Sequence, residues 1–411
     1  MEITLFYSII ALITITFLFD LWLSTLNYRN RHAPIPEEVS DVYHIEDYQK
    51  WHAYNMENYR LSLISKTLSF VLTLVILMLK VLPWLHDTIV KFDQSFFINT
   101  LLFLGIYYFF EYVIDLPMDY YKQFVIEEKY GFNKMTKKTF ILDQIKKLIL
   151  TLILGGLFLY FITSIYDYPG LFLYLWIFFV ILFINLFVGV FYVKLIVPIF
   201  NKLKPLEEGE LKDKIIEFSN RVGYEVKKIS IMDASRRSTK LNAFFTGMGK
   251  FKQIVLYDTL LTKMSDDQIL SVLAHEIGHN KHKHLLKGMV TQFIYLALLL
   301  ALLIVALKEN ILSTAFGFQE AHLGFGIIIF TALVSPLSYL ISTITNTISR
   351  KHEYEADHYA KIHGLGQELI ESLKILTREN FSNLTPHPLV VKIHYSHPTT
   401  SQRIIAINKN Q

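Results

Sequence analysis

The sequence predicts an all-α protein that crosses a membrane seven times. Of its 411 residues, 52% are hydrophobic and only 18% are charged, whereas a soluble chain carries roughly a quarter charged residues. Seven stretches have the length of about 20 mostly apolar residues that a membrane-spanning helix needs. They are residues 3–26, 62–85, 96–114, 147–165, 171–197, 286–307 and 324–346.

The first apolar stretch is predicted to be a membrane helix and not a signal peptide. It lacks a basic leader and carries Glu2. Its apolar run is longer than that of a signal peptide, and no small-residue cleavage site follows it.

Positive charge alternates between successive loops. The even-numbered loops are poor in basic residues. The second loop carries only Lys91, the fourth carries none, and the sixth carries only Lys308. The first and third loops are rich in basic residues, namely Arg29, Arg31, Lys50, Arg60, Lys122, Lys129, Lys134, Lys137, Lys138, Lys146 and Lys147. Cytoplasmic loops carry the excess of Lys and Arg. The pattern therefore predicts that the N-terminus lies outside, with residues 198–285 and 347–411 in the cytoplasm.

These spans divide the chain into four predicted parts. Residues 1–197 hold the first five spans, 198–285 form a polar cytoplasmic segment, 286–346 hold the last two spans, and 347–411 form a cytoplasmic tail. The polar segment is compact by its pattern. Its pattern predicts an amphipathic helix at residues 205–224 and a strand at 225–233. A second strand with a turn follows at 252–261, and a helix capped by Ser265 at 264–284.

Four ionisable residues fall inside predicted spans. Asp20 and Glu111 lie well within them, and such groups usually face a cavity or each other. They indicate a water-filled interior. Lys80 and Asp115 lie near span ends, where the alternative is that their side chains extend to the interface.

Several functional classes are disfavoured by composition. The chain has no cysteine, which excludes disulfides, thiolate metal ligands and cysteine nucleophiles. A net charge of +4, with no basic patch interleaved with aromatic residues, gives no indication of nucleic-acid binding. We expect the lipid bilayer and a protein or peptide substrate as partners, and a monomer.

Residues 275–279, His-Glu-Ile-Gly-His, form an H-E-x-x-H motif. On a helix, positions i and i+4 project from one face, so His275 and His279 can bind one zinc ion. Glu276 lies beside them and can act as a general base. Gly278 lowers the helix propensity here, which a helix can tolerate where its backbone packs closely.

A catalytic zinc ion typically takes three protein ligands. The best third candidate follows the seventh span, where Glu353 and Asp357 fall on one helical face. Glu353 could bind the metal, and Asp357 could accept a hydrogen bond from a ligating histidine. Glu355 points elsewhere on the helix. His352 and His358 remain rivals by residue type.

The tail holds a further patch with His394, His397 and Arg403. A cation or an imidazole there could stabilise the oxyanion of a tetrahedral intermediate, and the alternative is that these are surface residues. We expect His282 and His284 to be solvated residues at a helix end.

The sequence resembles the Ste24 type of CAAX prenyl proteases, the seven-span branch of the M48 zinc metallopeptidases. The carriers of the resemblance are HEIGH at 275–279 and EYEAD at 353–357. Further matching strings are FVIEEKYGFNKMT (124–136), VPIFNKLKPLEEGEL (197–211), LNAFFTG (241–247), IVLYDTLL (254–261) and HPTTSQRI (397–404).

The resemblance implies a barrel of seven helices around a large aqueous chamber, with one zinc ion near its cytoplasmic side. It implies His275, His279 and Glu353 as zinc ligands, with Glu276 as general base and acid. It further implies roles for Asp357 as partner of a ligand histidine, for Asn242 in binding the substrate backbone, and for His397 and Arg403 in stabilising the intermediate or binding substrate.

We therefore expect an integral membrane zinc endopeptidase that cleaves near the C-terminus of prenylated CAAX-type substrates, held extended by Asn242 and an edge strand at 252–258. Composition favours a bacterial inner membrane, with the endoplasmic reticulum as the alternative. Since bacteria generally lack such prenylation, an HtpX-like quality-control protease for unprenylated proteins is a second hypothesis. A metal transporter or non-catalytic scaffold is a third.

Overall fold

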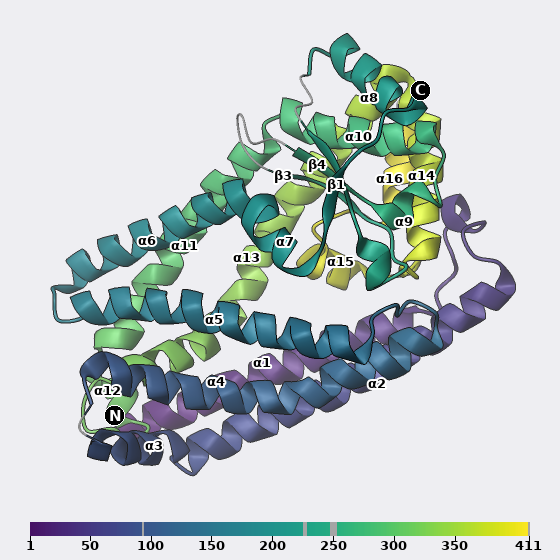
Figure 1. The fold of residues 1–411 in the computed structure, drawn as a ribbon. Helices are drawn as coiled ribbons and strands as arrows, with labels where there is room; N and C mark the ends of the chain where they lie inside the picture. Colours follow the sequence, from purple (N-terminus) through teal and green to yellow (C-terminus); the bar gives the residue numbers. More distant parts are fainter. Residues whose placement is uncertain (93, 225–227, 247–252, 410–411) are drawn as a thin grey trace.

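The computed structural model describes residues 1–92, 94–224, 228–246 and 253–409. Within these ranges, seven helices are long and apolar enough to cross a membrane, which confirms the predicted number. Their bounds are α1 (Glu2–Asn30), α2 (Ile45–Met78), α4 (Phe96–Tyr121), α5 (Lys137–Ile165), α6 (Gly170–Phe191), α11 (His284–Lys308) and α13 (Leu323–Ala360). The chain is a mostly helical membrane protein, and a small sheet is added to the predicted helices (Figure 1).

The second span differs from its predicted bounds of 62–85. Helix α2 begins at Ile45, because Trp51 in its polar first half is buried in the core of the polar region and only 1% exposed. It ends at Met78, and Lys80 adopts a left-handed conformation (φ 53°) before the separate helix α3 (Val81–Ile89). Lys80 therefore lies at the end of a span and not inside it.

Alternate loops gather at opposite ends of the long helices (Figure 1). At the end that holds the N-terminus, the second and sixth loops meet, with His86 Nδ1 2.9 Å from His322 Nε2. At the other end, Asn30 of the first loop donates to the carbonyl of Thr385 in the tail. The third loop there pairs with the polar segment through a bridge between Asn133 and Ser238. The odd-numbered loops thus share one end, as the alternating charge predicts.

Within its described residues, the polar segment contains a four-stranded sheet in the order β1-β2-β4-β3. Its strands are β1 (Leu203–Pro205), β2 (Ile229–Met232), β3 (Ala243–Thr246) and β4 (Gln253–Tyr257). Strands β2 and β4 pair with each other in parallel. Strand β1 pairs antiparallel with β2, and strand β3 pairs antiparallel with β4. Residues 225–227 of the predicted strand 225–233, and residue 252 of the other, lie outside the described residues.

The prediction of an edge strand at 252–258 is wrong. Strand β4 lies between β2 and β3, and its residues Ile254, Val255 and Leu256 are all buried. A continuous buried run is typical of a strand whose two faces are both covered. The outer strand on this side, among the described residues, is β3.

Short helices complete the polar end. They are α7 (Val197–Phe200), α8 (Glu210–Arg221), α9 (Asp258–Leu261), α10 (Asp266–Lys281), α14 (Gly366–Glu379), α15 (Pro388–His394) and α16 (Thr400–Lys409), with α12 (Asn310–Thr314) at the opposite end. One hydrophobic core joins Trp51 of α2, Ile215 of α8, Leu273 of α10 and Ile404 of α16. The first loop, the polar segment and the tail therefore fold as one unit.

Asp20 and Glu111 line the same cavity of about 340 Å³ between the long helices. Asp20 pairs with Lys66 at 2.7 Å, and Glu111 accepts a hydrogen bond of 2.7 Å from the Tyr107 hydroxyl. The predicted polar interior is thus present around these two carboxylates. Asp115 is exposed and does not line this cavity.

Candidate metal centre

The centre depends on a close crossing of α10 and α13 at Gly278. A Cβ atom at this position would lie 2.9 Å from Cβ of Tyr359 and 3.1 Å from Cα of Ala356. Only glycine allows this close approach, and the packing that results offsets the low helix propensity of glycine. The helix itself begins at a capping box, in which Ser265 and Gln268 each bind the other's backbone amide. The crossing places the H-E-x-x-H face of α10 against Glu353 of α13.

Replacing Gly278 with alanine is expected to separate the two helices. Overpacking costs about 1–3 kcal/mol, and backbone and Cβ atoms cannot rotate away. We expect a lower melting temperature and weaker metal binding. The control is Gly288→Ala on α11, where an added Cβ meets no atom within 4 Å. Thermal unfolding of both variants checks this. Equal stability of the two would contradict the close crossing.

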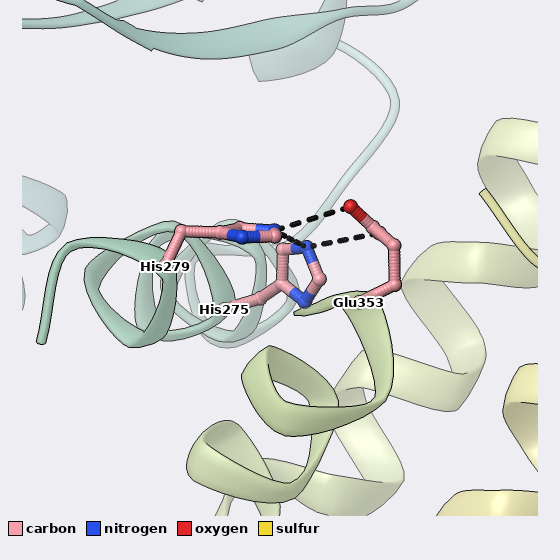
Figure 2. A group of neighbouring side chains, drawn as sticks. All are labelled: His275, His279 and Glu353. Carbon is pink, nitrogen blue, oxygen red and sulfur yellow. Dashed lines mark hydrogen bonds and ion pairs between the residues drawn. The ribbon is translucent and has the colours of Figure 1, made fainter. Parts of the chain in front are cut away.

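His275, His279 and Glu353 point toward one another (Figure 2). The Nε2 atoms of the two histidines are 3.1 Å apart. The Glu353 carboxylate lies 3.5 Å from Nε2 of His275 and 3.2 Å from Nε2 of His279. The three predicted ligands, which come from two helices far apart in the sequence, are brought together.

This donor set fits a metal ion. Glu353 is only 3% exposed, and its buried Oε2 atom has no hydrogen-bond partner among the described residues. The 3.2 Å contact to His279 is made by Glu353 Oε1 and the 3.5 Å contact to His275 by Oε2. One ligand atom from each of the three residues lies within 4.8 Å of the other two. A divalent cation would satisfy the orphaned oxygen and both facing nitrogens.

Asp357 lies behind His275, as predicted for a ligand's partner. Its Oδ1 is 2.9 Å from Nδ1 of His275, which leaves Nε2 of that ring free for a metal. Arg403 in turn donates from Nε to Oδ2 of Asp357 at 2.9 Å. Burial opposes the charge on Arg403, but the Asp357 carboxylate raises the pKa of this guanidinium above its usual value. Arg403 is therefore a fixed positive charge inside the centre, 3.5 Å from Glu353.

His397 occupies the open side of the centre. Its Nε2 lies 3.4 Å from Oε1 of Glu353, and its side chain is 64% exposed. Its other ring nitrogen is 2.9 Å from the Ser396 hydroxyl. An incoming ligand can therefore contact this imidazole directly. His394, the other histidine of the tail patch, is exposed near Tyr339 instead.

Glu276 is half-buried on the same helix as the two histidines. Burial works against protonation of His279, but the hydrogen bond and charge of Glu353, and then the charge of Glu276, raise the pKa of His279. Glu276 directly follows His275 on helix α10, which also carries His279. It makes no hydrogen bond or ion pair to another described side chain, so it is available to bind water or substrate.

Asn242 is exposed immediately before β3. Its side-chain oxygen accepts a hydrogen bond of 2.9 Å from the amide of Ala243, and its carbonyl accepts one from Tyr257. Strand β3 lies beside α10, the helix of the two histidines. Asn242 thus precedes the strand that contacts α10, and no hydrogen bond among the described residues joins it to the three candidate ligands.

The expectation that His284 is a solvated residue at a helix end is wrong. The chain turns at Lys283 (φ 56°), so His284 begins α11 and faces α13, where it is only 6% exposed. Its Nδ1 lies 2.9 Å from Nδ1 of His279, and its Nε2 lies 2.8 Å from Glu355. His282 is exposed as expected. The pair His284 and Glu355 was missed by the sequence reasoning.

Comparison with known proteins identifies the family of this chain. Residues 24–202 match the family model described as CAAX prenyl protease N-terminal, five membrane helices, and residues 205–411 match peptidase family M48. The chain belongs to peptidase family M48. A "CAAX prenyl protease 1 homolog" of Oryza sativa subsp. japonica is 32% identical, with 97% of this chain and 96% of the relative covered. "CAAX prenyl protease 1" of Saccharomyces cerevisiae is 38% identical, with 75% and 72% covered.

A solved structure shares the whole fold of this M48 peptidase. The crystal structure of S. mikatae Ste24p has a TM-score of 0.91 and 32% identity, and the match covers 97% of this chain and 98% of that one. The predicted resemblance to the Ste24 type is confirmed, and so is the prediction of a membrane-embedded metallopeptidase. The hypothesis of a metal transporter or scaffold is set aside.

Proposed function

We propose that this M48 peptidase hydrolyses peptide bonds near the C-terminus of CAAX-type substrates, with one zinc ion per chain. The observation that carries the proposal is the convergence of His275, His279 and Glu353, whose ligand atoms all lie within 4.8 Å of one another. The names of the relatives supply the substrate class.

Glu276 is proposed as the general base and acid. When bound, the metal ion would polarise the scissile carbonyl and make water more acidic. Glu276 would take a proton from water as its oxygen bonds to the carbonyl carbon. It would then deliver that proton to the leaving nitrogen as the C–N bond breaks. The new carboxyl group loses the remaining proton of the water to the leaving amine. The products are therefore a carboxylate and an ammonium group, and Glu276 is left ionised.

His397 and Arg403 are proposed to act on the same intermediate from different positions. The exposed imidazole of His397 can donate a hydrogen bond to the developing oxyanion. Arg403 is buried and binds Asp357. It would act by holding Asp357 against His275 and by adding a fixed positive charge behind Glu353.

The outer strand β3 is proposed to bind the substrate backbone. An extended peptide can add to a sheet edge through main-chain hydrogen bonds. Among the described residues, β3 pairs with β4 alone, and it lies beside α10. Asn242, at the start of this strand, would orient the peptide toward Glu276. Strand β3 thus takes the place of the strand at 252–258 as the proposed edge for substrate binding.

We propose that residues 198–285 and 347–411 face the cytoplasm and complete the centre together, with the N-terminus outside. The clustering of basic loops at the end that holds the centre supports this orientation. A bacterial inner membrane is favoured, with the endoplasmic reticulum as the alternative, and the chain is proposed to act as a monomer.

The substrate proposal is tested with paired peptides. We expect a farnesylated C-a-a-X peptide to be cleaved with a kcat/KM at least about tenfold above its unprenylated form, equivalent to about 1.4 kcal/mol of binding. The reason is that the apolar chain partitions into the bilayer and concentrates the peptide there. A farnesylated peptide with a scrambled C-terminus is the control. Equal cleavage of all three peptides would favour the quality-control function.

A further inference from the structure

We propose that His284 and Glu355 are positioning residues that hold His279 in the tautomer and ring orientation needed for metal binding. This inference rests on the assignment of His279 as a metal ligand in the proposed function. It does not depend on the identity of the substrate.

The contacts form one chain of ring nitrogens and a carboxylate. Nδ1 of His279 is 2.9 Å from Nδ1 of His284, and Nε2 of His284 is 2.8 Å from Oε2 of Glu355. The His284 side chain is only 5% exposed, whereas Glu355 is 30% exposed. The ring of His352 stacks on His284 with centroids 4.0 Å apart and planes 9° from parallel. His284 is therefore fixed in its plane.

Counting protons determines the direction of each hydrogen bond. Nε2 of His279 faces Glu353 and His275, so this nitrogen would supply the lone pair to the metal. A neutral imidazole then carries its proton on Nδ1. That N–H points at Nδ1 of His284, which must accept. The proton of His284 consequently lies on Nε2 and is donated to Glu355.

The arrangement matches that of the other ligand histidine. Nδ1 of His275 is 2.9 Å from Asp357, so a carboxylate fixes that ring directly. His279 achieves the same through one intervening imidazole. A carboxylate at the end of such a chain fixes the ring and raises the basicity of the ligand. Both metal-binding histidines thus have an acidic partner, one from each side of α13.

A second metal site is the rival interpretation, because His282, His284 and Glu355 also have ligand atoms within 4.8 Å of one another. A metal on Nε2 of His284 would leave the proton of that ring on Nδ1. It would then face the Nδ1 proton of a metal-bound His279 at 2.9 Å. Two N–H donors cannot share that contact. The hydrogen-bond chain is compatible with an occupied centre, and the second metal is not.

The test measures zinc affinity of the full-length protein by competition with a chromophoric chelator, without substrate. We expect His284→Ala and Glu355→Ala each to weaken zinc binding about 10–100-fold. Glu355→Gln should restore part of the loss, because its amide oxygen still accepts from His284. The matched control is His282→Ala, which removes a neighbouring imidazole and should keep wild-type affinity. Cobalt-substituted protein should show altered d–d absorption in His284→Ala and not in His282→Ala.

Two results would overturn the proposal. One is wild-type zinc affinity in both His284→Ala and Glu355→Ala. The other is a second zinc equivalent in the wild type that His282→Ala abolishes. Because Glu355 is partly exposed, its variants keep the test decisive if His284→Ala does not fold. His279→Ala distinguishes failure of the positioning proposal from failure of the ligand assignment. If His279→Ala also kept wild-type zinc affinity, the assignment of His279 as a metal ligand would be wrong.

Discussion

Glu276→Gln is expected to abolish peptide hydrolysis and to leave metal binding intact. The amide preserves the size and polarity of the side chain but cannot take a proton from water. General acid–base catalysis contributes about 10²–10⁴-fold, so kcat should fall by that factor or more. The measurement is single-turnover hydrolysis of a C-a-a-X peptide, together with zinc content.

The matched control is Glu217→Gln, which makes the same change at an exposed glutamate on α8. It should retain wild-type kcat. If Glu276→Gln cleaved at the wild-type rate, the assignment of the base would be wrong. If it lost its zinc, Glu276 would belong to the metal-binding set instead.

Removal of the metal is expected to have an effect of comparable size. Metal catalysis supplies several kcal/mol of transition-state stabilisation, so a chelator should lower the rate at least about 10³-fold. One equivalent of zinc should restore it. Glu353→Ala should mimic chelation at ordinary zinc concentrations, because it removes the carboxylate from the three proposed ligands.

Here the control is Glu371→Ala on α14, an exposed glutamate that contacts Gln268. Its activity should survive at the zinc concentration where Glu353→Ala is inactive. Undiminished hydrolysis in the presence of a strong chelator would rule out a metal-dependent mechanism. Restoration that required several equivalents would contradict a single ion per chain.

The parts of this protein that the sequence predicts correctly depend on local periodicity. A helix places His275 and His279 on one face whatever surrounds it, and a second helix does the same for Glu353 and Asp357. The seven spans follow from apolar length alone. The close helix packing at Gly278 is also predictable, since a glycine within such a helix indicates close approach of another backbone.

The errors have a common physical cause, which is dependence on contacts distant in sequence. The early start of α2 follows from burial of Trp51 against segments far along the chain. The central place of β4 depends on which strands pair. His284 becomes buried because Lys283 adopts a left-handed turn, and lysine carries no signal for that conformation.

The placement of the centre across α10, α13 and α16 sets the time at which this enzyme can become active. His275 and His279 leave the ribosome several seconds before Glu353, at ordinary rates of synthesis. Arg403, which fixes Asp357, follows later still. A nascent chain that has made the H-E-x-x-H helix would therefore lack the third proposed ligand until α13 has entered the bilayer. On the proposed ligand assignment, proteolytic activity would therefore begin only after α13 has been inserted.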